Sequence, residues 1–145
     1  MLEEIEKKKE VVITIRTSQI SFQTKEEDSM ELVTTGKKYE KNGSTYLIYE
    51  ESEVSGLKGN TTTIKISGAT ISMVRSGGTS SKMVFEEGRR HKSLYDTEFG
   101  KLSMEILTKE VNILKTESSL NARINYDITL KGMFEGKNIL EISVN

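Results

Sequence analysis

Three carboxylates follow an apolar, strand-like run in the stretch TYLIYEESEVSG, residues 45–56: Glu50, Glu51 and Glu53. A β-strand directs alternate side chains to opposite faces, so at least one of these glutamates shares the buried face of its strand. A carboxylate that is buried without a partner is costly, and it either pairs with a cation or binds a proton. The stretch therefore predicts an acid in the interior of the fold.

Two orientations of this strand are open. If Tyr49 faces inward, Glu51 and Glu53 face inward as well, whereas an inward Ile48 takes only Glu50 with it. Two carboxylates on one face of a strand have Cα atoms about 6.5–7 Å apart, a spacing that would also permit the acid–base pair of a glycosidase. Because that spacing is common by chance in strands, we do not interpret the stretch as a glycosidase site.

The best partner for the buried acid is Arg75. It continues the alternation of Ala69, Ile71 and Met73, so we expect it to point inward near the end of a later strand. A Glu51–Arg75 pair has two interpretations: a salt bridge that closes one end of the fold, or a polar anchor for the head group of a ligand. In the second interpretation, the apolar wall of the ligand site consists of Tyr49, Met73, Phe85, Tyr95 and Tyr126.

No other motif carries a catalytic signature. His91 is the only histidine, which rules out a metal site built from several histidines. The basic run GRRHK, residues 88–92, could bind a phosphate or a carboxylate, but such runs are more often solvated loops. The run RSGGTSSK lacks the spacing of a phosphate-binding loop, and no serine lies in a G-x-S-x-G motif. We predict no catalytic residue, no metal site and no cofactor, and an enzyme is the weakest of our hypotheses.

The composition narrows the class of partner. A formal net charge of −1 over 145 residues disfavours nucleic acid and anionic membranes as targets, because phosphate binding requires a basic excess. The absence of cysteine excludes disulfides and thiol chemistry. The N-terminal run MLEEIEKKKE has no apolar segment typical of a secretory signal, and no apolar run is long enough to span a bilayer. We therefore expect a cytoplasmic protein.

The elements that must position these residues are β-strands. Threonine, valine and isoleucine are abundant, proline is absent, and apolar side chains alternate along most of the chain. The run KNGS, residues 41–44, predicts a two-residue hairpin turn, and a change of parity predicts a turn or bulge near Lys109 and Glu110. Residues 87–100 are expected to form mostly a loop, with a short strand near residues 94–97, and the composition of residues 100–117 would also suit a helix.

These patterns predict one all-β domain. We expect a charged lead-in at residues 1–10, followed by a single β-barrel domain at residues 11–145. About nine or ten short strands joined by tight turns, each with one apolar face, are typical of an up-and-down antiparallel barrel.

Several runs, taken in order, resemble the YwiB-like family of uncharacterised bacterial proteins. They are YLIYEESE at 46–53, TTTIKI at 61–66, MVRSGGTSSKMVFEEGRRHKSLYDTEFGKL at 73–102 and INYDITLKG at 124–132. The resemblance implies an antiparallel lipocalin-like (calycin) β-barrel of about eight to ten strands. It implies no established activity. Because the resemblance is strongest around Tyr49 and Glu51, it favours the orientation in which these two residues face inward.

Two hypotheses of different classes follow. The first is a β-barrel that binds a small, partly apolar ligand, with an anionic head group as one option, oriented by Glu51 and Arg75. The alternative is a non-enzymatic interaction module that uses the basic loop or a strand edge. A small-molecule ligand is thus the expected partner, and neither nucleic acid nor a membrane is expected. The oligomeric state is open, with a homodimer as one option.

Overall fold

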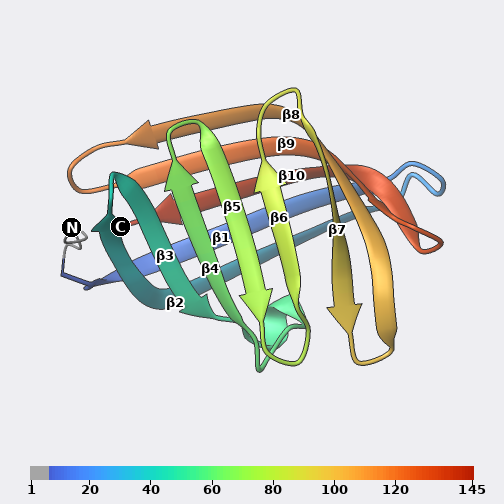
Figure 1. The fold of residues 1–145 in the computed structure, drawn as a ribbon, viewed down its shortest axis with the longest axis horizontal. Coiled ribbons are helices and arrows are strands. Elements are labelled where there is room, and N and C mark those ends of the chain that lie inside the picture. The colour runs from blue at the N-terminus through green and yellow to red at the C-terminus, as the bar shows by residue number, and fades with distance from the viewer. Residues whose placement is uncertain (1–6) are drawn as a thin grey trace.

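The computed structural model describes residues 7–145, in which ten β-strands form one antiparallel sheet. The sheet is curled into a nearly closed barrel (Figure 1). The strands are β1 (Lys9–Ser21), β2 (Glu27–Lys41), β3 (Ser44–Glu50), β4 (Thr61–Ser67), β5 (Thr70–Ser76), β6 (Ser81–Phe85), β7 (Arg90–Thr97), β8 (Gly100–Lys115), β9 (Leu120–Leu130) and β10 (Phe134–Val144), with a short 3₁₀ helix, η1 (Glu53–Ser55), after β3. The all-β antiparallel barrel predicted from the sequence is confirmed. No helix in this part of the chain has the length and apolar character needed to cross a bilayer.

The strands follow one another around the barrel in an up-and-down path. Strand β1 also pairs with β10, which gives the order β6-β5-β4-β3-β2-β1-β10-β9-β8-β7 and leaves β6 and β7 at its two ends. We call the gap between these two strands the β6–β7 seam. It is crossed by one isolated bridge between Ser80 and Asp96, and by a hydrogen bond of 3.0 Å from Ser93 Oγ to the carbonyl of Lys82. The barrel is therefore hydrogen-bonded all round except along the seam.

The barrel has two distinct ends. One end carries η1 together with the β5–β6 and β7–β8 turns, and we call it the η1 end (Figure 1). The opposite end carries the β2–β3 and β8–β9 turns, the start of β1 and the end of β10, and we call it the hairpin end. Each end brings together side chains that are far apart in sequence.

The predicted hairpin turn and bulge are both present. Asn42 and Gly43 have φ angles of 50° and 80°, the positive values that a type I′ turn requires, and they join β2 to β3. The pairing of β8 with β9 shifts between Thr108 and Glu110, which is the β-bulge expected from the change of parity. Because of the bulge, both Thr108 and Val111 pack toward the interior although they are three positions apart.

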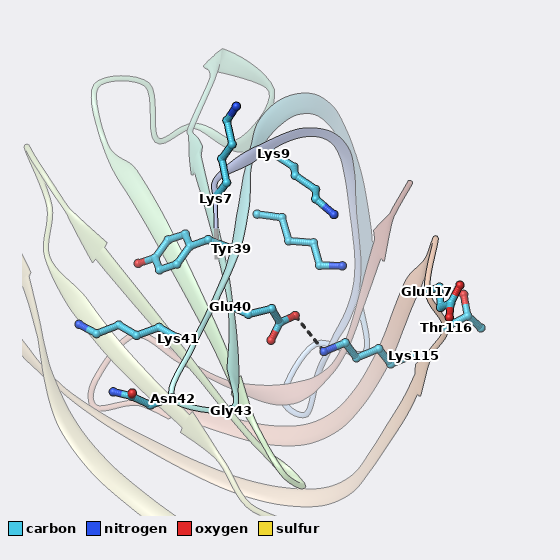
Figure 2. Close-up of a pocket in the computed structure, with 11 residues that line it drawn as sticks. Lys7, Lys9, Tyr39, Glu40, Lys41, Asn42, Gly43, Lys115, Thr116 and Glu117 are labelled. Carbon is cyan, nitrogen blue, oxygen red and sulfur yellow. Dashed lines mark hydrogen bonds and ion pairs between the residues drawn. The ribbon is translucent and has the colours of Figure 1, made fainter. Parts of the chain in front are cut away.

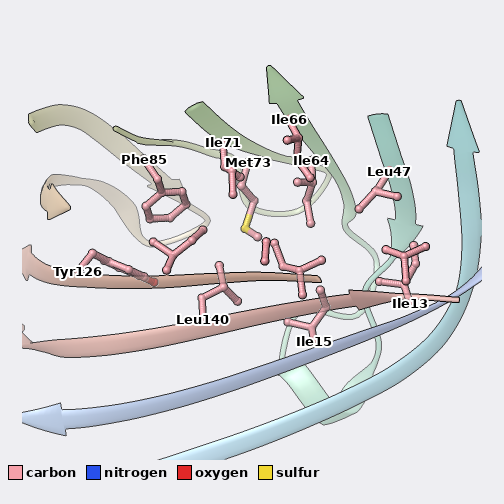
Figure 3. Close-up of a cluster of buried hydrophobic side chains, with 14 of the residues drawn as sticks. Ile13, Ile15, Leu47, Ile64, Ile66, Ile71, Met73, Phe85, Tyr126 and Leu140 are labelled. Atoms are coloured by element: carbon pink, nitrogen blue, oxygen red, sulfur yellow. The ribbon is translucent and has the colours of Figure 1, made fainter. Parts of the chain in front are cut away.

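One apolar face of each strand fills the middle of the barrel (Figure 3). The side chains of Ile13, Leu47, Ile64, Ile71 and Phe85 have no exposed area. Full burial of a side chain of this size stabilises the fold by about 1.5–3 kcal/mol. The middle of the barrel is thus a packed core.

Three local expectations differ from the structure. A loop over residues 87–100 is wrong, because β7 begins at Arg90 and pairs with β8 over eight residues. Ala69 does not extend the inward face of β5, since it is exposed in the β4–β5 turn. Strand β1 begins at Lys9, inside the expected charged lead-in, of which residues 1–6 lie outside the described part of the chain.

Candidate ligand-binding site

Three neighbouring strands bring the predicted polar residues together. In the register of β3, β4 and β5, Thr62 lies opposite Tyr49 on one side and opposite Arg75 on the other. Tyr49 and Thr62 are 3% and 0% exposed, so the row points into the barrel. Glu51 comes directly after the end of β3 and lies on the same face as Tyr49. The orientation with Tyr49 and Glu51 inward is therefore correct.

The predicted ion pair between Glu51 and Arg75 is present. Arg75 Nη2 lies 3.5 Å from Glu51 Oε2, and the two side chains are 14% and 2% exposed. The same carboxylate oxygen accepts a hydrogen bond from Thr62 Oγ1. The backbone N–H of Glu51 donates to the carbonyl of Asn60 at 2.9 Å, which fixes the residue beyond the strand end. The buried acid is thus held by a cation, a hydroxyl and its own backbone.

Glu53 does not take part in this site. Its side chain is 81% exposed and pairs with Lys58 at 3.2 Å. Ser52 caps η1 by accepting a hydrogen bond from the backbone N–H of Val54, so the strand alternation ends before residue 53. The expectation that Glu53 faces inward with Glu51 is wrong.

A cavity of about 210 Å³ lies beside the ion pair at the η1 end. Five of the seven predicted site residues line it, namely Tyr49, Glu51, Met73, Arg75 and Tyr126. The remaining lining residues are Ile15, Thr17, Met30, Ser55, Leu57, Met83 and Leu140. A mostly apolar wall with a few polar groups is the general character of small-molecule sites. We call this space the Arg75 cavity.

Arg75 carries a donor that the protein does not use. Its Nε atom is buried, and it has no hydrogen-bond partner among residues 7–145. An unpaired buried donor costs about 1–3 kcal/mol, so native proteins rarely leave one without an acceptor. Since Arg75 lines the cavity, an acceptor placed there could satisfy this N–H.

The two tyrosines of the cavity are held in their neutral form. Burial raises the pKa of the Tyr49 hydroxyl far above its usual value, and the negative charge of Glu51 raises it further. Burial also raises the pKa of Tyr126, although the side-chain amide of Asn138, which donates to the Tyr126 hydroxyl at 3.1 Å, acts in the opposite direction. Neither hydroxyl is therefore suited to act as a base near neutral pH.

Two predicted wall residues lie outside the cavity lining. Phe85 is fully buried and packs on the ring of Tyr126 with centroids 4.8 Å apart, so it supports the wall from behind. Tyr95 lines a separate apolar groove of about 510 Å³, between the η1 region and the β7–β8 turn. Leu57 lines both this groove and the Arg75 cavity.

Three residues of the basic run at residues 88–92 lie beside acids. Arg90 Nη1 and Lys92 Nζ lie 3.2 Å and 3.8 Å from the carboxylate of Glu105, and His91 Nε2 lies 3.1 Å from Glu86. These pairs are on the barrel surface, where each contributes about 0–1 kcal/mol. No group of three or more potential metal ligands is found among the described residues.

Comparison with known proteins agrees with this architecture. A family model described as "Domain of unknown function (DUF1934)" matches residues 13–142. The chain belongs to this family. It is 28% identical over 122 residues to the "Uncharacterized beta-barrel protein YwiB" of Bacillus subtilis (strain 168), covering 83% of this chain and 84% of that protein. The solved structure of the ywiB protein from Bacillus subtilis superposes with a TM-score of 0.79 at 24% identity, over 94% of this chain and 92% of that one. The resemblance inferred from sequence is confirmed, and with it the barrel.

The hairpin end holds a feature that the sequence patterns did not reveal to us. An open cleft of about 490 Å³ is lined by five lysines and two glutamates (Figure 2). Lys9 and Lys38 continue the inward-facing alternation of Val11 and Ile13 in β1 and of Gly36 in β2. That parity was available from the sequence, but the pairing that places Lys9 against Lys38 was not.

Proposed function

We propose that the protein is a small-molecule-binding β-barrel whose ligand occupies the Arg75 cavity. The observation that supports this function best is the buried, unpaired Nε–H of Arg75 in the wall of an otherwise apolar space. A purely structural salt bridge would be expected to leave no donor unsatisfied. A ligand acceptor at this position would remove the cost of the unpaired donor and gain the apolar contacts of Met73 and Tyr126.

The size of the cavity restricts the ligand. An apolar cavity of about 150 Å³ can hold benzene. The Arg75 cavity, at about 210 Å³, therefore suits a single ring or a short branched chain with one polar group. A long acyl chain would not fit, because the middle of the barrel is filled by buried side chains such as Ile13, Leu47 and Ile71.

The charge balance of the site bears on the head group. Glu51 already offsets the charge of Arg75, with the two groups 3.5 Å apart. An anionic head group would leave a net negative charge in a buried site, which is costly, whereas a carbonyl or hydroxyl acceptor would not. We therefore favour a neutral acceptor over the anionic head group that the sequence also suggested. Comparing the binding of a small carboxylic acid with that of its amide distinguishes the two.

Native mass spectrometry of protein purified from its own host tests this function. Arg75→Lys keeps a cation beside Glu51 but removes the guanidinium Nε donor, so we expect the co-purifying ligand to be lost with little loss of stability. Arg16→Lys is the matched control, because Arg16 forms an exposed ion pair with Glu31 at 2.6 Å on the outer surface. If no wild-type preparation carries a bound molecule, or if Arg75→Lys retains it, the proposal fails.

A second candidate function is supported by the β6–β7 seam. Two sheet edges with unused backbone groups face each other there, and such edges accept an added strand from a peptide. The basic run contributes less to this candidate than the sequence suggested, since Arg90, His91 and Lys92 have acidic partners. Monomeric behaviour in light scattering, together with no captured partner, would count against this interaction function.

A further inference from the structure

The cleft at the hairpin end concentrates positive charge on the inner face of the barrel mouth. Lysines 7, 9, 38, 41 and 115 line it, together with Tyr39, Glu40, Asn42, Gly43, Thr116 and Glu117. Its volume of about 490 Å³ falls within the usual range for ligand pockets, about 300–1,000 Å³. For a chain whose overall formal charge is −1, this is a strong local excess of cations.

Lys9 and Lys38 form a like-charge pair on the inner face of the barrel mouth. They are direct cross-strand partners in the β1–β2 ladder, and both belong to the inward-facing rows of their strands. Like charges placed directly opposite each other destabilise a sheet. Among residues 7–145, no carboxylate lies within ion-pairing distance of either ammonium group.

The neighbouring pair on the outer face is arranged differently. Lys37 is opposite Glu10 in the same ladder, and its Nζ lies 3.8 Å from the Glu10 carboxylate. The outer pair, Lys37 and Glu10, therefore has complementary charges that face the solvent. The inner pair, one residue away on each strand, consists of two cations that face the cleft. This contrast shows that, among residues 7–145, the outer pair has its complementary charge and the inner pair does not.

The floor of the cleft is already neutral. Lys115 Nζ donates to Glu40 Oε1 and to Thr45 Oγ1, both at 2.9 Å, and the Thr45 hydroxyl also donates to the Glu40 carboxylate at 2.8 Å. Burial alone would raise the pKa of Glu40. The hydrogen bonds from Lys115 and Thr45, with the charges of Lys115 and Lys38, outweigh it and hold the pKa below its usual value. Glu40 is thus an ionised partner for Lys115, and Figure 2 shows Lys9, Glu40 and Lys115 directed toward the same space.

We propose that this cleft binds a compact multivalent oxyanion, carried by a phosphate or polycarboxylate group, between Lys9 and Lys38. Ammonium groups bind such anions as point charges with three donors each. An anion between the two lysines would convert their repulsion into two attractive contacts. The site is at the opposite end of the barrel from the Arg75 cavity. This proposal is therefore independent of the proposed function, and each can fail without the other.

Calorimetric titration with pyrophosphate and with citrate, at constant ionic strength, tests the site. We expect Lys38→Met and Lys9→Met each to weaken the binding of at least one of these anions by about tenfold or more, while Lys37→Met leaves it unchanged. Pyrophosphate bound more tightly than citrate would point to a phosphate group, and the reverse order to a polycarboxylate.

Without anion, the Lys38→Met variant should have a melting temperature no lower than that of the wild type, because the substitution removes a repulsion. Equal weakening by Lys37→Met and Lys38→Met, or no binding of either anion to the wild type, would overturn the proposal.

Discussion

Thr62 and Arg75 hold the same oxygen atom of Glu51. Thr62 Oγ1 donates to Glu51 Oε2, and Arg75 Nη2 reaches that atom from the neighbouring strand at 3.5 Å. Thr62 is completely buried, so water does not compete for this hydrogen bond. The acid is therefore fixed in place, while the Nε atom of Arg75 is left for another partner.

Replacing Thr62 tests how much this arrangement stabilises the fold. Thr62→Val keeps the shape of the side chain and removes the donor to a buried carboxylate, so we expect it to lower the free energy of unfolding by about 1–3 kcal/mol. Thr62→Ser keeps the donor and should lose less. Urea denaturation of both variants is the measurement, and equal losses would mean that the hydroxyl contributes nothing beyond its packing.

The buried tyrosines predict a dependence of stability on alkaline pH. Burial raises the folded-state pKa values of Tyr49 and Tyr126 above the unfolded value of 10.0. Their contribution to stability is therefore complete below pH 10.0 and is lost as the pH rises from there toward the folded-state values. Tyr126→Phe should make the decline above this pH shallower in denaturation curves. An unchanged slope would show that Tyr126 is not protected from ionisation.

Gly36 is closely packed by neighbouring atoms near the hairpin end, so we predict that it does not tolerate a larger residue. A Cβ atom added there would lie 2.5 Å from the carbonyl oxygen of Ile48 and 2.6 Å from Ile13 Cδ1. Overpacking of this kind costs about 1–3 kcal/mol, so Gly36→Ala should lower the melting temperature clearly. Gly78→Ala is the control, because no atom lies within 4 Å of its added Cβ. Similar melting temperatures for the two variants would contradict the packing at Gly36.

We predict that a ligand enters the Arg75 cavity past the side chain of Leu57. Leu57 borders both this cavity and the outer apolar groove, and it lies between Gly56 and Gly59, which have φ angles of 75° and 95°. We expect Leu57→Ala to speed association of a cavity ligand in stopped-flow measurements and to leave the Arg75 contact intact. Leu94→Ala, a change of an exposed leucine in β7, should have no effect. A rate that is unchanged by Leu57→Ala would place the entrance elsewhere.

Much of the fold could be predicted from the sequence because strand parity is a local signal. The bulge near Thr108 and the inward direction of Arg75 follow from counting alternate residues, whereas alternation left Glu50 and Glu51 open and the family resemblance favoured Glu51. Strand β7 was harder to predict, because Arg90 and Lys92 are exposed and the inward-facing side chains of this strand are only partly buried beside the seam. The sequence of such an edge strand is as polar as that of a loop, so its pattern does not distinguish the two.

The sites depend on information that alternation does not contain. The end of β3 is set by the Ser52 cap, which turns Glu53 outward although it shares the parity of Glu51. Tyr95 has an inward parity, yet it lines a different groove, at the β7–β8 end of the seam. The meeting of Lys9 with Lys38 depends on the register of two strands, which neither strand determines alone.

A crystal structure of the protein purified from its host, without unfolding or extensive dialysis, tests the ligand-binding function most directly. We predict density for a small molecule in the cavity lined by Tyr49, Met73 and Tyr126, with an acceptor atom within hydrogen-bonding distance of Arg75 Nε. A cavity that is collapsed or holds only water, with Arg75 Nε bonded to a protein group or to that water, would contradict it. In that case the Glu51–Arg75 pair would be a structural salt bridge.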